Sequence, residues 1–247
     1  MYTHLVRDII RAHNICFHTY ADDTQLFCDF NPKIPGDCER ALGVLTSCVS
    51  EINTWMCQNM LQLNQEKTEF IVIATPRTLS NLPEIHLKLG GVTIRASTTV
   101  KNLGVIIDAS LNMSGQISAI CKSVNFHIRN LWRIRKFITR EACHHAVRAL
   151  VLSRIDYANS LLYGAKQFDL QRLQRLQNKA ARLVFACGRD QSSSHLLCTL
   201  HWLPVQDRIK YKILLYVYKS LNNQAPNYLT DILKLYNASS STEDSRR

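Results

Sequence analysis

The sequence predicts an α+β chain in which a partial antiparallel sheet backed by helices precedes a mostly α-helical domain. Up to Asp108, short apolar segments alternate with turn residues, and beyond it apolar residues recur with the 3.6-residue period of a helix. With 247 residues, 46% of them hydrophobic, the chain can form one large domain or two small ones. We expect an α+β domain at residues 1–109, a helical domain at 110–236 and a disordered polar tail at 237–247.

The first elements are a helix at residues 5–13 and a hairpin of two apolar strands, at 15–20 and 24–30. Asp22 and Asp23 occupy the junction of the two strands. After a linker rich in proline and glycine, Asp37 is placed to cap a long helix. Apolar residues at helical spacing predict that this helix packs one face on a sheet: Leu42, Leu45, Val49, Ile52 and Met56.

Further strands are expected at residues 70–74, at 85–89 and 92–94 around Gly90-Gly91, and at 100–107. The last segment is interrupted by Gly104, which is compatible with a β-bulge. Together these strands predict one antiparallel sheet in the first domain.

Stripes of apolar residues predict the helices of the second domain. The first stripe is Ile117, Ile120, Val124, Ile128 and Leu131, the second begins with Ala146, Val147, Leu150 and Val151, and the third is Leu170, Leu173, Leu176, Ala180, Leu183 and Val184. A last helix after Pro204 carries Ile209, Ile213, Val217 and Leu221.

The charge of the chain favours a polyanionic partner. Thirty Lys and Arg against 19 Asp and Glu give a net charge of +11, which suits nucleic acid or, from charge alone, an anionic membrane. No apolar run approaches the roughly 18 residues of a membrane span. Nine scattered cysteines without paired spacing indicate a reducing compartment, so we expect an intracellular protein of the nucleus or cytoplasm.

The Asp22-Asp23 pair is the first candidate site. Two adjacent carboxylates at the tip of an apolar hairpin repel each other, and a bound divalent cation removes that repulsion. Mg²⁺ takes one or two protein carboxylates together with substrate phosphates, as in nucleotidyl transfer. An isolated Asp-Asp pair in a loop is more often solvated surface. Whether this pair binds a metal therefore has to be judged from the surrounding sequence.

Four segments, in their order and spacing, resemble the reverse transcriptases of non-LTR (LINE-type) retrotransposons. They are residues 20–27, which begin Tyr20-Ala21-Asp22-Asp23, the helix around Trp55, residues 61–69 and residues 100–108. Segments 149–159, 173–182 and 200–205 are similar to sequences that follow the polymerase core in such elements. The resemblance implies a C-terminal fragment of an RNA-directed DNA polymerase, with the end of the palm at 1–109 and a thumb-like or connection region at 110–236.

The resemblance also implies roles for individual residues. Asp22 and Asp23 are implied to be catalytic and to ligate Mg²⁺, Lys67 to lie near the incoming triphosphate, and Tyr20 to contact nucleic acid. Leu103 and Gly104 are implied to form the hairpin that grips the primer end. The implied partner is a duplex of RNA template and DNA primer.

One expected element of the family is not found in the sequence. The family carries a third carboxylate on a strand well upstream of the hairpin, and residues 1–16 contain no counterpart of it. The fingers region of the polymerase, which surrounds that strand, has no counterpart there either. We therefore expect no polymerase activity from this chain alone. The alternative is a non-catalytic nucleic-acid-binding remnant that uses its basic helices.

Two sets of basic residues recur at three- and four-residue steps, so that each forms one helix face. The first set is Arg129, Arg133 and Lys136, continued by Arg140, and the second is Arg172, Arg175, Lys179 and Arg182. Such faces are often only solvated, but few acids interrupt either set, which favours contact with a nucleic-acid backbone.

Overall fold

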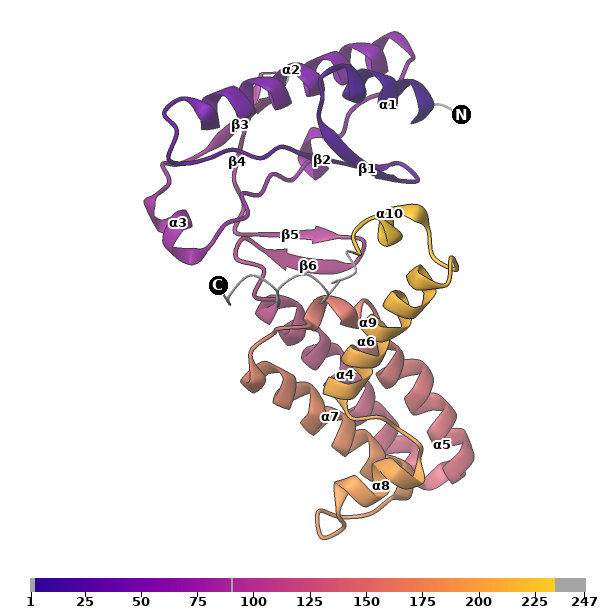
Figure 1. The fold of residues 1–247 in the computed structure, drawn as a ribbon. Coiled ribbons are helices and arrows are strands. Elements are labelled where there is room, and N and C mark those ends of the chain that lie inside the picture. Colours follow the sequence, from indigo (N-terminus) through magenta and orange to yellow (C-terminus); the bar gives the residue numbers. More distant parts are fainter. Residues whose placement is uncertain (1–2, 90, 234–247) are drawn as a thin grey trace, which may run out of the picture. The chain divides into compact units, whose positions relative to one another are not determined.

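The computed structural model describes residues 3–89 and 91–233 and divides into two compact units, Met1–Leu111 and Asn112–Arg247 (Figure 1). Each unit is described by itself. The polar tail expected at 237–247 lies outside the described residues. Among the described residues, no helix has the length and apolar character to cross a membrane.

The core of the first unit lies between two helices and the acidic hairpin. Helices α1 (Thr3–Ala12) and α2 (Asp37–Gln58) lie beside the hairpin of β1 (Cys16–Tyr20) and β2 (Asp23–Phe27) (Figure 1). Ile10 of α1 and Cys48 of α2 are completely buried, and Phe17 and Leu26 of the hairpin pack against them. The same side of the hairpin is fixed by Arg7, whose Nη2 donates a 2.7 Å hydrogen bond to Thr19 Oγ1.

The strands of this unit form three separate antiparallel hairpins, so the single sheet predicted from the sequence is wrong. The hairpins are β1–β2, β3 (His86–Leu89) with β4 (Val92–Arg95), and β5 (Thr99–Asn102) with β6 (Val105–Asp108). In each, the described ladder joins only the two strands of that hairpin. The alternation of side chains along a strand predicts which residues share a face, but it does not specify which strand lies beside it.

The strand expected at residues 70–74 is also wrong. This segment touches its neighbours at two points, where Phe70 O accepts from Ser97 N (2.7 Å) and Ala74 N donates to Ala109 O (3.0 Å). The short helix α3 (Pro76–Asn81) follows and was not expected. The sequence at the start of α3 is typical of a helix N-terminus: Thr75 Oγ1 accepts a hydrogen bond from Thr78 N, and Pro76 occupies the first turn.

Asp37 does not cap α2 as expected. Gly36, with φ 79°, precedes the helix, and Asp37 is its first residue. The carboxylate instead accepts hydrogen bonds from Asn31 N and Arg40 Nε, each 2.7 Å long. The backbone hydrogen bond, followed by that from Arg40, lowers the pKa of Asp37 below its ordinary value. Asp37 therefore fixes the loop that leads into the helix.

The second unit is helical. Its elements are α4 (Ser114–Ile134), η2 (Arg135–Phe137), α5 (Arg140–Val147), the π-helix η3 (Arg148–Leu152), α6 (Ser153–Asp156), η4 (Asn159–Leu162), α7 (Gln167–Phe185), α8 (Ser193–Thr199), α9 (Val205–Leu221) and α10 (Asn227–Thr230). Every residue of the predicted Ile117 and Leu170 stripes is buried, which confirms these two faces as core. Leu221, at the end of the last predicted stripe, is 52% exposed instead.

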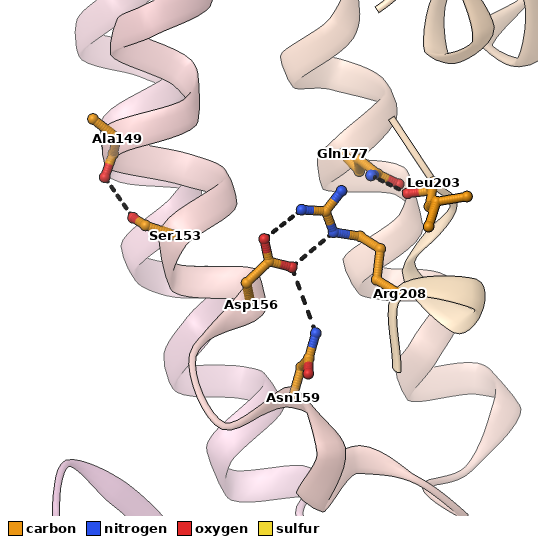
Figure 2. A network of polar contacts seen from close by, with 7 residues as sticks. All are labelled: Ala149, Ser153, Asp156, Asn159, Gln177, Leu203 and Arg208. Carbon is orange, nitrogen blue, oxygen red and sulfur yellow. Dashed lines mark hydrogen bonds and ion pairs between the residues drawn. The ribbon is translucent and has the colours of Figure 1, made fainter. Parts of the chain in front are cut away.

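The second predicted stripe is only partly correct because a π-helix interrupts it. Val147 and Val151 are fully buried, whereas Leu150 is 37% exposed. The wider π turn inserts one residue into the helical repeat and shifts the residues that follow around the axis. Ser153 Oγ donates to Ala149 O across this turn (Figure 2).

Buried and half-buried polar side chains hold the helices of the second unit together (Figure 2). The guanidinium of Arg208 on α9 forms a bidentate ion pair with the carboxylate of Asp156 at the end of α6. Gln177, fully buried on α7, donates a 2.8 Å hydrogen bond to Leu203 O. Arg135 donates to Leu183 O and Val184 O in the last turn of α7, where the final carbonyls lack the regular partner four residues further on; Leu183 O also accepts from Ala186 N over 3.2 Å.

Candidate metal and nucleic-acid site

The acidic hairpin turns over two residues. Tyr20 pairs with Asp23 in the ladder, so Ala21 and Asp22 form the turn and Asp23 is the first residue of β2. Ala21 has φ 54°, a left-handed conformation that costs a residue with a side chain on the order of 1–2 kcal/mol. Asp22 and Asp23 are both exposed, and Tyr20 is 67% exposed. The structure thus presents both carboxylates at the tip of the hairpin.

The two faces of this hairpin differ in character. Because side chains alternate along a strand, Phe17 and Leu26 share the face that packs on the core. Asp23 and Gln25 share the other face. The hairpin is therefore fixed mainly by apolar contacts on one side, while its other side carries Asp23 and Gln25 together with the exposed rings of Tyr20 and Phe27.

Leu103 and Gly104 form the turn of a second hairpin. Asn102 pairs with Val105, and the two turn residues have φ 44° and 81°. Positive φ at both positions is typical of the type I′ turn, whose twist matches that of the flanking strands. Gly104 is a turn residue, so the alternative of a β-bulge is wrong.

A side-chain hydrogen bond joins the two hairpins. Gln25 Nε2 of β2 donates to Asn102 Oδ1 of β5 over 2.6 Å, and both side chains are half-buried. Gln25 lies two residues after Asp23, and Asn102 lies directly before the Leu103-Gly104 turn. This contact fixes the acidic strand relative to the second turn. Neither residue was expected to have a role, although the position of Gln25 on the face of Asp23 follows from the strand period.

The segment of Lys67 is attached to the second hairpin. Lys67 ends the short helix η1 (Gln65–Lys67), and its backbone N donates to Asn64 Oδ1 over 3.2 Å. Two residues later, Glu69 Oε2 accepts a 3.1 Å hydrogen bond from Lys101 N of β5. The side chain of Lys67 is exposed, and no ion pair joins it to Asp22 or Asp23 within the described residues.

The donor chemistry of Asp22 and Asp23 fits Mg²⁺, which prefers carboxylate oxygens and keeps positions for water and substrate phosphates. Two carboxylates are fewer than the three that the resemblance implies. In the described ranges 3–89 and 91–233, His, Cys, Asp and Glu do not form a group of three or more that could hold a metal ion. The pair therefore fits as part of a metal site.

The two basic sets differ in the structure. Arg129, Arg133 and Lys136 are exposed, as expected for a binding face. In the second set, Arg175 and Lys179 are exposed and Arg182 is half-buried.

Arg172, the first residue of the second set, already has protein partners. Its Nη1 lies 2.9 Å from Asp169 Oδ1, and its Nη2 donates to Ser118 Oγ over 3.1 Å. Asp169 itself is buried on α7. Arg172 thus connects α7 with α4, and the exposed charge of the second set rests mainly on Arg175 and Lys179.

Comparison with known proteins finds a family match in the first part of the chain. Residues 1–107 match the family described as reverse transcriptase (RNA-dependent DNA polymerase). Neither the curated proteins nor the solved structures include a match. The matched segment contains Asp22, Asp23, Lys67, Leu103 and Gly104, and the family implies binding of nucleic acid. The match therefore supports a reverse transcriptase domain in residues 1–107.

Proposed function

We propose that residues 1–109 are the C-terminal part of the palm of a LINE-type retrotransposon reverse transcriptase, followed by a thumb-like region. The family match over residues 1–107 supports the polymerase. The four ordered segments that end at residues 100–108 support the LINE type. The match to a polymerase family does not favour the alternative of a purely nucleic-acid-binding module.

The hydrogen bond between Gln25 and Asn102 carries this proposal. Primer extension needs the primer end close to the catalytic carboxylates, within a few tenths of an ångström of its productive position. The Gln25–Asn102 contact joins the strand of Asp23 to the Leu103-Gly104 turn, and Glu69 joins the same hairpin to the segment of Lys67. Segments separated by some 80 residues in sequence thus form one connected cluster.

Each residue of this cluster has a proposed task. Asp22 and Asp23 hold Mg²⁺, which when bound neutralises phosphate oxygens and lowers the pKa of the attacking hydroxyl. The exposed amino group of Lys67 pairs with the triphosphate of the incoming nucleotide. Leu103 and Gly104 hold the primer end, and the exposed ring of Tyr20 contacts the nucleic acid beside them.

Metal binding tests the first of these tasks. Mn²⁺, a paramagnetic substitute for Mg²⁺, is titrated into the protein, and the free ion is followed by electron paramagnetic resonance. We expect Asp22→Asn/Asp23→Asn to weaken binding at least tenfold and Asp29→Asn, an exposed acid beyond β2, to leave it unchanged. Equal binding by the wild type and the double variant would contradict the metal site.

We also propose that this chain alone does not extend a primer. Asp22 and Asp23 have no third carboxylate beside them in the described residues, and removing one charged group from a preorganised site costs about 10²- to 10³-fold in rate. The assay is extension of a labelled primer on an RNA template by purified protein with Mg²⁺ and nucleotides. Processive extension that disappears in Asp22→Asn/Asp23→Asn would overturn this part of the proposal.

In the thumb-like region, we propose that the basic faces contact the phosphate backbone of the RNA template and the DNA primer. Arg129, Arg133 and Lys136 supply exposed charge on one face, and Arg175 and Lys179 supply it on the other. Binding through phosphates weakens steeply with salt. Each phosphate that is neutralised adds about one to the slope with which the logarithm of the affinity falls against the logarithm of the salt concentration. A salt-independent affinity would exclude this mode of binding.

A further inference from the structure

One face of α4 combines exposed cations with exposed aromatic rings. Between Asp108 and Glu141 the sequence has no acidic residue. Along α4 and into η2, side chains at four- and three-residue steps share the side opposite the buried Ile117 stripe. We call this set the α4 face; it consists of Lys122, Phe126, Arg129, Arg133, Lys136 and Phe137.

The aromatic rings of the α4 face are not part of the core. Phe126 is 60% exposed and Phe137 is 75% exposed. The ring centres of Phe126 and His127 lie 5.3 Å apart with the rings nearly perpendicular, and the amino group of Lys136 lies 4.9 Å from the centre of the Phe137 ring. Much of each ring is therefore open to another aromatic group.

The cations of the α4 face have no acidic partner in the described part of the chain. Lys122, Arg129, Arg133 and Lys136 are exposed, and none makes an ion pair or a side-chain hydrogen bond within residues 3–89 and 91–233. Arg172, in contrast, is occupied by Asp169. No acidic side chain in these residues neutralises the four charges, so a bound anion can pair with them.

Cations alone suit any polyanion, but exposed rings select for unpaired bases. The bases of a duplex are already stacked on one another, whereas those of a single strand can stack on an aromatic side chain. We propose that the α4 face binds single-stranded nucleic acid, with bases on Phe126 and Phe137 and phosphates on the four cations. This inference rests on the proposed contact of Arg129, Arg133 and Lys136 with nucleic acid, and it names the form that the face prefers.

The spacing of the rings suits a short strand. Phe137 lies eleven positions after Phe126; at about 1.5 Å per residue in α4 and about 2 Å in η2, the two rings are roughly 18 Å apart along the axis. At about 3.4 Å per nucleotide, a stacked strand covers that length with about five nucleotides. The cations lie along the same length, so one short segment reaches both rings and all four charges.

Fluorescence anisotropy with the full chain tests this inference. The probes are a labelled RNA strand of about 12 nucleotides, the same strand in a blunt RNA–DNA duplex, and an abasic strand of equal length. The buffer contains no divalent cation or nucleotide, so failure of the metal site does not affect the result. We expect the single strand to bind about tenfold or more tightly than the duplex and the abasic strand.

Three variants separate stacking from charge. Phe126→Ala/Phe137→Ala is expected to weaken single-strand binding about tenfold or more and to leave duplex binding within twofold. Arg129→Gln/Arg133→Gln is expected to weaken the binding of both the single strand and the duplex. It should also lower, by about two, the slope of the logarithm of the affinity against the logarithm of the salt concentration. Phe168→Ala, which removes an equally exposed ring (65%) at the start of α7, is the matched control and should change neither.

The outcomes distinguish this inference from the proposed function. Equal affinity for single strand and duplex, full binding of the abasic strand, or an unchanged single-strand affinity in Phe126→Ala/Phe137→Ala overturns the inference alone. Absence of binding to all probes also overturns the proposed contact of the basic residues with nucleic acid. Loss of the single-strand preference in Phe126→Ala/Phe137→Ala, but not in Phe168→Ala, supports the inference.

Discussion

Gln25 Nε2 donates a hydrogen bond of 2.6 Å to Asn102 Oδ1, and this contact joins the acidic hairpin to the Leu103-Gly104 hairpin. A net contribution of about 1 kcal/mol is usual for such a half-buried bond. We predict that Gln25→Ala and Asn102→Ala each destabilise the first unit. The loss of stability in the double variant should be smaller than the sum of the two single losses by about 1 kcal/mol. Hydrogen exchange in peptides from β2 and β5 measures the effect, and strictly additive losses would exclude a direct interaction.

The Leu103-Gly104 turn predicts opposite effects for two neighbouring substitutions. Gly104→Val places a β-branched residue at φ 81° and should destabilise the hairpin by about 1–3 kcal/mol. Leu103→Gly relieves the side-chain strain at φ 44° and should be neutral or slightly stabilising. Hydrogen exchange in β5 and β6 distinguishes the two, and a well-tolerated valine at position 104 would contradict the turn geometry.

In the second unit, the ion pair of Arg208 with Asp156 predicts a loss of stability when one partner is removed. The side chains are 19% and 36% exposed, so solvent screens the pair only in part. Arg208→Ala should destabilise the unit by about 1–3 kcal/mol because it leaves the Asp156 carboxylate without its main partner. Urea unfolding followed by far-UV circular dichroism measures this loss, with Lys210→Ala on the exposed side of α9 as control. A midpoint equal to that of the wild type would show that the pair is not stabilising.

Asp169 predicts a specific loss of stability in acid. Ser114 Oγ donates to its Oδ2 over 2.7 Å, and Arg172 binds its Oδ1. These hydrogen bonds, that from Ser114 first, lower the pKa of Asp169 below the ordinary value of 3.8. A depressed folded-state pKa adds stability above the unfolded pKa, and this is lost as the pH falls through the folded value.

The matching experiment compares melting temperatures at about pH 6 and at pH values below about 4. The wild type should lose more of its stability on acidification than Asp169→Asn, which has no carboxylate to protonate. Asp207→Asn, an exposed acid on α9, serves as control. Identical acid sensitivity in the wild type and Asp169→Asn would show that Asp169 does not contribute.

Local patterns predicted the elements better than their assembly. The Ile117 and Leu170 stripes lie in the core because a buried helix face has to carry apolar side chains at helical spacing. The acidic hairpin followed from two apolar runs around a short turn. The single sheet was wrong because the apolar pattern of a strand does not specify its neighbour. The contacts that replace the sheet, Gln25–Asn102 and Glu69–Lys101, are made by polar groups far apart in the sequence.

Candidate site residues followed from the motifs, but their partners did not. The motifs gave roles to Asp22, Asp23 and Lys67. Gln25, Glu69 and Asn102 lie in the same motif segments, but the resemblance implied no role for them, and the contacts that connect their segments were not predicted. The basic sets show the same limit. Arg172 has the helical spacing of a binding face, yet its partner Asp169 lies three residues earlier on the same helix. Charge periodicity alone does not separate a paired arginine from a free one.

We propose that Asp22 and Asp23 are the metal-binding carboxylates of a polymerase palm. A chimera tests it most directly: residues 1–109 replace the corresponding segment of an active LINE-type reverse transcriptase that retains its own third carboxylate and fingers. Mg²⁺-dependent primer extension is then measured on an RNA template. We predict activity in the chimera, a loss of at least about 10²-fold in Asp22→Asn or Asp23→Asn, and no loss in Asp29→Asn. Full activity after substitution of both Asp22 and Asp23 would contradict the account.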